Sequence, residues 1–312
     1  MASLHILRSG PHSLVIDKGR VGFQDIGVSP GGAADQHAYN WANRLVGNPA
    51  NSAALEITFG GVELQFSHAC RIAVCGANMP LSLSPANSAK QVNLWQSIDI
   101  SAGQTFKLAA ARTGLRSYLA IQGGLRVHQE LNSYSSSPRQ GLGPFNGRAL
   151  KMGDQLPYLP VSQFAKRLTQ QTPVRFVPNY QQPLKLALIP GYQFSQFSPQ
   201  QIDLLTKQTY HISDLSDRMG IRLEGEAFAT PPKSLESEAI AQGAVQVPPN
   251  GLPIILSVDR QTVGGYPKLG CISRLDLFAL NQCRPQQTVQ FYLSSQQQQR
   301  QRWLAFERYF SW

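Results

Sequence analysis

Acidic residues are scarce in this sequence, and their scarcity sets its net charge. Only 18 Asp and Glu oppose 28 Lys and Arg in 312 residues, which gives a formal charge of +10. No run of four Lys or Arg occurs, and no RNA-binding or zinc-finger signature is present, so the charge does not predict a nucleic-acid partner. An anionic small substrate or an acidic partner protein suits the charge better, although a basic surface without any function is the commonest case.

Long hydrophobic runs and paired cysteines are also missing. Nowhere do 18 apolar residues follow one another, and the first eight residues contain no continuous apolar stretch, so we expect a cytoplasmic protein with no membrane contact. The four cysteines form no C-x-x-C pair, and we expect reduced, mostly buried thiols at Cys70, Cys75, Cys271 and Cys283. If residues 70–75 form a strand, Cys70 and Cys75 lie on opposite faces because their separation is odd.

Patterns of metal ligands are absent as well. The six histidines show neither H-E-x-x-H nor any paired spacing, so we expect no dedicated metal site. A Mg²⁺ ion that arrives with a nucleotide would need only one or two carboxylates from the protein.

Short strands dominate what is present. Apolar or alternating runs between turn residues predict strands at 4–7, 55–58, 62–66, 71–74, 105–108, 118–121, 184–189, 221–223, 244–247, 254–258 and 288–293. A chain of 312 residues with 42% hydrophobic residues is long enough for two cores. We therefore predict two β-rich domains, residues 1–165 and 180–312, with a Pro- and Gln-rich linker within 157–183.

Helical spacing is much rarer. Four helices are predicted. The first has an apolar face over 34–45 and ends at Gly47-Asn48-Pro49, the second begins at Ser198-Pro199, and the third is capped by Ser273. The fourth lies in the Gln-rich tail and has Trp303, Phe306 and Phe310 on one side. The tail helix should pack on the body of the protein or on a partner. The fold class is mainly β with a few short helices, consistent with barrels or sandwiches.

Some motif-like stretches have simpler explanations. Gly27-Val-Ser-Pro-Gly31 spells the nucleophile elbow G-x-S-x-G, but the elbow needs the N–H that Pro30 lacks, so we interpret Ser29 as a turn residue. Gly265 to Gly270 has the glycine spacing of a P-loop without the Lys and Ser or Thr that must follow. Lys151 lies in a stretch that faintly resembles a biotin-attachment site, but Gly153-Asp154 forms an ordinary turn after it.

The most informative stretch follows the predicted strand at 254–258. It reads Asp259-Arg-Gln-Thr-Val-Gly-Gly-Tyr-Pro-Lys268, and so gathers polar side chains around two glycines at one end of a strand. Gly264 and Gly265 would let backbone N–H groups approach a ligand closely. The alternative is a solvated hairpin loop, since Gly-Gly followed by Pro also makes a turn.

Several motifs together carry a resemblance to a known family. They are Gly27-Val-Ser-Pro-Gly-Gly-Ala-Ala-Asp35, Ala42-Asn43 with Gly47-Asn48, Leu55-Glu-Ile-Thr58, Ser216-Asp-Arg-Met-Gly220, Gly243-Ala-Val-Gln-Val-Pro-Pro249 and Gln261-Thr-Val-Gly-Gly-Tyr-Pro-Lys268. In this order they resemble the biotin-dependent carboxyltransferase-like family, which includes the C subunit of 5-oxoprolinase, the second subunit of allophanate hydrolase and the antagonist of a histidine-kinase inhibitor. The similarity spans nearly the whole chain.

The resemblance implies two cyclophilin-like β-barrel domains and an active site completed by a smaller carboxyltransferase-like subunit, with a lactam-opening subunit as a further partner. It also implies an ATP-dependent hydrolase that opens the lactam of 5-oxoproline, with Mg²⁺ carried by the nucleotide and no covalent biotin on this chain. The chemistry requires groups that hold phosphate and carboxylate and a base that directs water. The implied catalytic residues are Asp259, Lys268 and Tyr266; the implied substrate- or nucleotide-binding residues are Asp35, Asn43, Arg218, Gln246, Gln261, Thr262, Gly264 and Gly265.

Departures from the family pattern leave the substrate open. Ile16 stands where the family has Gln, Ala34 where it has Met, and Val263 where it has a second Thr. Two alternatives to a 5-oxoprolinase subunit therefore remain: a carboxyltransferase component of a urea carboxylase or allophanate system, which would need a biotinyl protein, and a regulator that only binds a histidine-kinase inhibitor.

Overall fold

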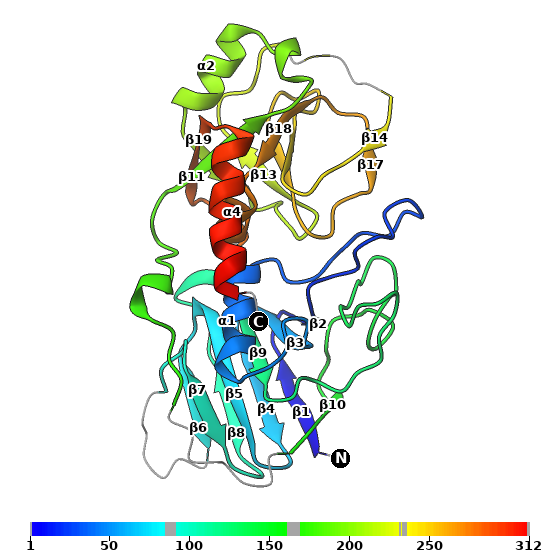
Figure 1. Cartoon of the computed structure of the whole chain (residues 1–312), viewed down its shortest axis with the longest axis vertical. Helices are drawn as coiled ribbons and strands as arrows, with labels where there is room; N and C mark the ends of the chain where they lie inside the picture. The colour runs from blue at the N-terminus through cyan, green and yellow to red at the C-terminus, as the bar shows by residue number, and fades with distance from the viewer. Residues whose placement is uncertain (1, 85–91, 161–168, 231, 233–235, 311–312) are drawn as a thin grey trace. The chain divides into compact units, whose positions relative to one another are not determined.

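The computed structural model describes residues 2–84, 92–160, 169–230, 232 and 236–310. The chain forms two compact units (Figure 1): unit 1 contains Met1–Arg20 and Gly31–Gln181, and unit 2 contains Val21–Pro30 and Gln182–Ser311. Strands predominate in both, so the prediction of a mainly β fold is confirmed. The chain enters unit 2 for Val21–Pro30, returns to unit 1 at Gly31, and passes into unit 2 again after Gln181. The last crossing lies inside the stretch predicted as a linker, of which residues 161–168 lie outside the described residues.

Unit 1 is built from two antiparallel five-stranded sheets. The order in the first is β10-β1-β4-β8-β6, made of β1 (Ala2–Ser9), β4 (Val62–Phe66), β6 (Leu81–Ser84), β8 (Thr105–Leu108) and β10 (Gln155–Tyr158). The order in the second is β2-β3-β9-β5-β7, made of β2 (His12–Ile16), β3 (Ala54–Thr58), β5 (Cys70–Asn78), β7 (Ser97–Ile100) and β9 (Thr113–Ile121). Apolar side chains from both sheets meet in one core, among them Leu4, Phe66 and Phe106 from the first and Leu55, Val74 and Leu119 from the second.

Helix α1 (Gln36–Leu45) packs on β5 and β9 of the second sheet (Figure 1). It begins after Asp35, whose carboxylate accepts the N–H of Ala38 at 3.1 Å as an N-cap. Cys70 of β5 belongs to the core between the sheets, whereas Cys75 lies outside that cluster although it is equally buried, which confirms their opposite orientation. Both thiols are free, and burial raises the pKa of Cys70 to about 12.

Unit 2 is a closed barrel. Its order is β11-β18-β15-β16-β13-β12-β19, made of β11 (Leu184–Pro190), β12 (Tyr210–Ile212), β13 (Gly220–Glu224), β15 (Ala244–Gln246), β16 (Ile254–Leu256), β18 (Lys268–Ile272) and β19 (Thr288–Leu293). Parallel pairing of β11 with β19 closes the barrel. A ribbon of β14 (Glu238–Ala239) and β17 (Val263–Gly264) stands beside it. The predicted barrel is thus present in unit 2, while the strands of unit 1 form two sheets around a shared core.

Three helices belong to unit 2. In α2 (Pro199–Lys207), Ser198 and Gln201 form the reciprocal hydrogen bonds of a capping box, which confirms the predicted start. Ser273 is the N-cap residue of α3 (Arg274–Leu280), as predicted, although its side chain makes no capping hydrogen bond. Two single-turn 3₁₀ helices, Val174–Phe176 in unit 1 and Phe194–Gln196 in unit 2, complete the helical elements of the described chain.

The Gln-rich tail docks as predicted. It forms α4 (Gln296–Phe310), and the rings of Trp303 and Phe306 pack on Phe278 of α3 with centroids 6.3 and 5.8 Å away. Arg302 adds an ion pair with Asp276 at 3.0 Å.

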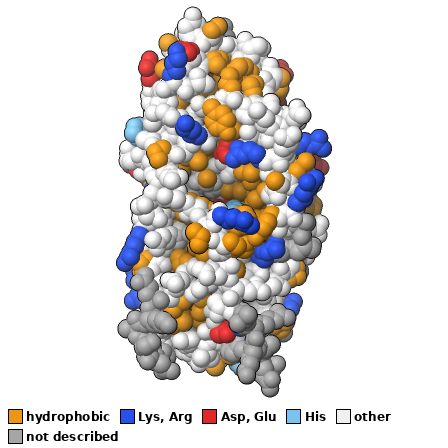
Figure 2. Space-filling view, turned by 60° about the vertical axis from the view of Figure 1, so that its left-hand side comes forward, with side chains coloured by type: hydrophobic (Ala, Val, Ile, Leu, Met, Phe, Trp, Pro, Cys, Tyr) orange, Lys and Arg blue, Asp and Glu red, His pale blue; other side chains and the backbone are white. Residues whose placement is uncertain are grey.

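Positive charge is dispersed on the surface. The face shown in Figure 2 carries scattered Lys and Arg side chains with few acidic side chains among them, as expected when a positive charge arises from a shortage of acids. Within the described residues, no helix is both long and apolar enough to cross a bilayer.

Candidate ligand-binding site

A cavity of about 510 Å³ lies on the outer face of the unit 2 barrel. Its floor is formed by β13, β16 and β15. One residue of each strand belongs to the barrel core: Ile221, Ile255 and Val245. The positions next to them therefore face outward. The outward residues that line the cavity are Gly220, Arg222, Ile254, Leu256 and Gln246. The volume is within the range of roughly 300–1,000 Å³ that is typical of small-molecule sites.

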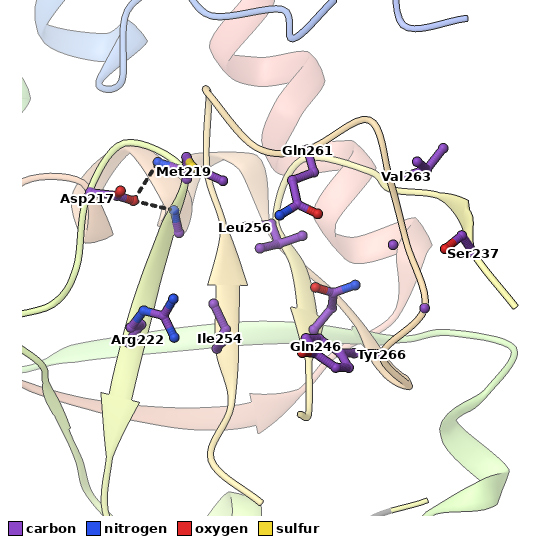
Figure 3. Close-up of a pocket in the computed structure, with 13 residues that line it drawn as sticks. Asp217, Met219, Arg222, Ser237, Gln246, Ile254, Leu256, Gln261, Val263 and Tyr266 are labelled. Atoms are coloured by element: carbon purple, nitrogen blue, oxygen red, sulfur yellow. Dashed lines mark hydrogen bonds between the residues drawn. The ribbon is translucent and has the colours of Figure 1, made fainter. Parts of the chain in front are cut away.

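The loop singled out in the sequence forms the opposite wall (Figure 3). Gln261, Val263, Gly264, Gly265 and Tyr266 line the cavity from this side. The pairing of Glu238 with Gly264 in the β14–β17 ribbon holds the loop in place. A Cβ atom added at Gly264 would lie only 2.6 Å from Cδ1 of Ile240 and 3.3 Å from Nε2 of Gln246. A larger residue at this position would force the side chains of Ile240 and Gln246 to shift, so glycine lets the loop lie close to both.

Gln246 brings an unpartnered polar group to the cavity. The residue is only 5% exposed, and its Nε2 is buried without a hydrogen-bond partner among the described residues. Figure 3 shows the amides of Gln246 and Gln261 pointing toward one another across the cavity. Because a buried donor without a partner costs about 1–3 kcal/mol, a ligand that offers an acceptor here would be stabilised.

The charged residues of the cavity are Asp217 and Arg222. Asp217 Oδ1 accepts the N–H groups of Met219 at 2.8 Å and Gly220 at 3.1 Å, the two bonds drawn in Figure 3. Arg222 is exposed on β13, and none of the ion pairs found in the described part of the chain includes it. Arg222 is therefore the cation that is available to an anionic ligand in this cavity.

Asp259 and Lys268 each have a different partner. Asp259 accepts two hydrogen bonds from the guanidinium of Arg218, at 2.7 and 3.1 Å, and both side chains are largely buried. The ammonium of Lys268 forms an ion pair with Glu238. This ion pair is the main cause that lowers the pKa of the Glu238 carboxyl, and the hydrogen bond from the Tyr192 hydroxyl is the second cause. The sequence placed Asp259 and Lys268 together; the structure instead gives them separate ion pairs, and neither lines the cavity.

Asp35 and Asn43 lie in unit 1 and serve its internal structure. Besides capping α1, the carboxylate of Asp35 accepts the hydroxyl of Tyr180 at 3.0 Å. Oδ1 of the fully buried Asn43 accepts Nδ2 of Asn48 at 2.8 Å. Both side chains are thus engaged in hydrogen bonds that fix α1 and the turn after it.

Comparison with known proteins places this architecture in a family. The carboxyltransferase domain, subdomain A and B, matches residues 26–293. The chain belongs to the carboxyltransferase domain family. It is 36% identical to the C subunit of the 5-oxoprolinase of Escherichia coli K12 over 289 residues, which covers 92% of this chain and 90% of that protein. The corresponding protein of Haemophilus influenzae is 35% identical, with 95% and 92% covered. The crystal structure of the K. lactis urea amidolyase superposes with a TM-score of 0.90 at 26% identity, over 99% of this chain and 20% of that one.

In this chain, five of the predicted binding and catalytic residues line the cavity together: Gln246, Gln261, Gly264, Gly265 and Tyr266. The carbonyl of Thr262 accepts the N–H of Ile240 at 3.0 Å, which anchors the loop. Sequence reasoning missed Arg222. The only signal for it was the alternation of Ile221, Arg222 and Leu223, which places the arginine outward but does not distinguish it from a solvated one.

The motif-like stretches behave as ordinary structure in this carboxyltransferase fold. The hydroxyl of Ser29 donates to the carbonyl of Arg260 at 2.6 Å, which supports its interpretation as a structural residue. Lys268–Ile272 is a barrel strand, whereas a P-loop leads into a helix. Lys151 occupies a turn closed by the N–H of Asp154, which donates to its carbonyl at 3.2 Å.

Proposed function

We propose that this chain is a subunit of a cytoplasmic, ATP-dependent 5-oxoprolinase complex that hydrolyses 5-oxo-L-proline to L-glutamate. The supporting observation is the near-complete mutual coverage with the C subunit of 5-oxoprolinase, 92% of this chain and 90% of the E. coli protein. By contrast, the chain corresponds to only 16% of the urea amidolyase of Saccharomyces cerevisiae.

ATP-dependent opening of a lactam requires phosphorylation of the amide oxygen and then attack by water on the activated carbon, which releases phosphate and breaks the C–N bond. Tyr266 lines the cavity and offers a hydroxyl to this reaction. We propose that Lys268 holds an anionic oxygen and that Asp259 orients water or Mg²⁺. To do so in the complex, each would exchange its present partner, Glu238 or Arg218, for the reacting groups.

The cavity itself does not fit a nucleoside triphosphate. Its lining contains one cation, Arg222, and one carboxylate, Asp217, which together leave no net positive charge for a triphosphate. We therefore propose that ATP and its Mg²⁺ are bound outside the cavity but next to its opening, where the γ-phosphate can reach the lactam oxygen, at a site to which the smaller carboxyltransferase-like subunit and a lactam-opening subunit contribute. On this proposal the isolated chain is inactive.

A second candidate is the carboxyltransferase component of a urea carboxylase or allophanate system. The structural similarity to the K. lactis urea amidolyase, with a TM-score of 0.90 over 99% of this chain, favours it. This function would require a biotinyl protein as partner.

Native co-purification followed by an ATPase assay tests the proposal. We expect the tagged chain to bring down a smaller subunit, and the complex to hydrolyse ATP only when 5-oxo-L-proline is present, with release of glutamate. Turnover by the purified chain alone would contradict the shared site. Transfer of a carboxyl group from a biotinyl protein, without any 5-oxo-L-proline-dependent ATP hydrolysis, would favour the second candidate.

A further inference from the structure

One row of side chains crosses the floor of the unit 2 cavity. Arg222 of β13 and Gln246 of β15 both pair with Ile254 of β16, so all three side chains are on the same outward face. Neighbouring strands are about 4.8 Å apart, which puts the Cα atoms of Arg222 and Gln246 roughly 10 Å from each other. A small ring can lie over Ile254 between a cation and an amide.

Gln246 differs from another buried glutamine of the same unit. Gln193 is 2% exposed, and both ends of its amide are used: Oε1 accepts the N–H of Lys268 at 2.7 Å, and Nε2 donates to Glu238 at 2.7 Å. Gln246 is 5% exposed, yet its Nε2 has no hydrogen-bond partner within the described structure. Since native proteins satisfy nearly all buried polar groups, a buried Nε2 without a partner on a cavity wall is placed to donate to a molecule bound there.

The chemistry of a primary amide selects the ligand. A glutamine side chain presents a donor and an acceptor side by side, and a half-turn about its last bond exchanges them. A small lactam ring fixes its own N–H and C=O on one edge, in the cis arrangement, so the two edges can form a pair of complementary hydrogen bonds. An open-chain trans amide cannot present both groups on one edge.

We propose that Gln246 and Arg222 determine substrate specificity in this cavity: Gln246 pairs with the cis-amide edge of a lactam, and Arg222 binds a carboxylate on the same ring. Ile254 provides the apolar surface beneath the ring methylenes. Asp217, the other charged residue of the lining, is occupied by the N–H groups of Met219 and Gly220. The inference rests on the proposed function, whose substrate combines these two groups.

Steady-state kinetics of the purified complex test both contacts. Arg222→Gln should raise KM for 5-oxo-L-proline about ten- to a hundredfold, since hydrogen bonds to charged groups contribute more than neutral ones. The inhibition constant of 2-pyrrolidinone, the same lactam without a carboxylate, should change less than about twofold. Gln246→Met, nearly isosteric, should weaken both ligands about ten- to a hundredfold, because two hydrogen bonds are lost. Matched controls are Gln290→Leu, on β19 of the same barrel, and Arg300→Gln, exposed on α4.

Two results would overturn the specificity proposal: a KM within about twofold of wild type for both variants, or equal weakening of the two ligands by Arg222→Gln. Calorimetric titration of the complex with 5-oxo-L-proline separates this proposal from the proposed function. Binding that is lost in Gln246→Met, in a complex without ATP hydrolysis, would refute the function and support the specificity residues. Absence of any binding would refute both.

Discussion

Two sets of polar side chains, one in each unit, are arranged differently. In unit 1, Glu56 accepts the hydroxyl of Tyr118 at 2.8 Å and the N–H of Ala34 at 3.0 Å, and that hydroxyl in turn accepts the N–H of Asp35 at 2.8 Å. The pKa of Tyr118 is raised well above its ordinary value, mainly by burial and secondly by the nearby Glu56 carboxylate. In unit 2, Gln246 is buried with a free amide, and Arg222 faces solvent without an ion pair among the described residues.

This difference distinguishes polar groups that stabilise the fold from polar groups that can bind a ligand. A polar network whose members bond to one another rigidifies a core and leaves little for a ligand. A polar group that is buried without a partner lowers stability, and where it lines a cavity a ligand can supply the missing hydrogen bond. Asp35 and Asn43, which the family resemblance implied as binding residues, belong to the first kind by their contacts, and Gln246 belongs to the second.

The largest expected effect is on the unit 1 network. Glu56→Ala would leave the buried Arg116 without its carboxylate partner, 3.6 Å away, and Tyr118 without an acceptor. We expect a loss of about 3–5 kcal/mol in the free energy of unfolding, measured by urea denaturation. Asp203→Ala, which removes the exposed partner of Lys207 on α2, is the control and should have almost no effect. A loss below about 1 kcal/mol for Glu56→Ala would mean that the network is not structural.

The next largest effect concerns turnover. If Lys268 and Asp259 act on the reacting groups, Lys268→Ala and Asp259→Asn in the assembled complex should each reduce kcat on the order of a hundred- to a thousandfold. Folding and partner binding should stay nearly intact, checked by melting temperature and co-purification. If both variants kept full activity, the ion pairs of Lys268 with Glu238 and of Asp259 with Arg218 would serve only to hold the loop in place.

A smaller effect is expected at the tail helix. Trp303 packs on Phe278 and lies under the guanidinium of Arg274, 4.4 Å from the ring centroid. Because Trp303 is only partly buried, Trp303→Ala should lower the unfolding free energy by about 1–2 kcal/mol, less than a fully buried aromatic. Leu304→Ala, at a neighbouring exposed position, should change it by less than about 0.5 kcal/mol. Equal effects of the two variants would show that α4 does not dock through its aromatic side.

The smallest effect is a pH dependence in unit 1. Arg148 holds the pKa of Asp154 below its usual value, with ion-pair distances of 2.7 and 2.8 Å. A lowered folded pKa stabilises the protein above the unfolded pKa of about 4, and this contribution is lost as the pH falls through the folded pKa. Asp154→Asn should therefore lower the unfolding free energy by up to about 1 kcal/mol near neutral pH and by less in acid. If the difference in unfolding free energy between wild type and Asp154→Asn stayed constant from neutral to acidic pH, the lowered pKa of Asp154 would be contradicted.

Patterning along the sequence predicted the longer strands and the tail helix, because alternation and helical spacing are local properties. The two-residue strands β14 and β17 are too short to show alternation. Closure of the barrel depends on the pairing of Leu184 with Val289, far apart in the chain, which no local pattern encodes. The Gly-Gly loop was found because its composition is unusual.

The partners of the loop residues could not be found in the same way. Lys268 pairs with Glu238, 30 positions earlier, and Asp259 with Arg218, 41 positions earlier. Nothing in the sequence chooses these partners over the pairing of Asp259 with Lys268 that proximity favours. Arg222 became visible only when the barrel register placed it in a row with Gln246.

A crystal structure of the complex with 5-oxo-L-proline would test the central claim most directly. We predict that the lactam N–H and C=O lie about 2.7–3.2 Å from the amide of Gln246, that the carboxylate contacts Arg222, and that the bonds among Glu56, Tyr118 and Asp35 are unchanged. A ligand bound at the Asp35 network, or outside the unit 2 cavity altogether, would contradict the account.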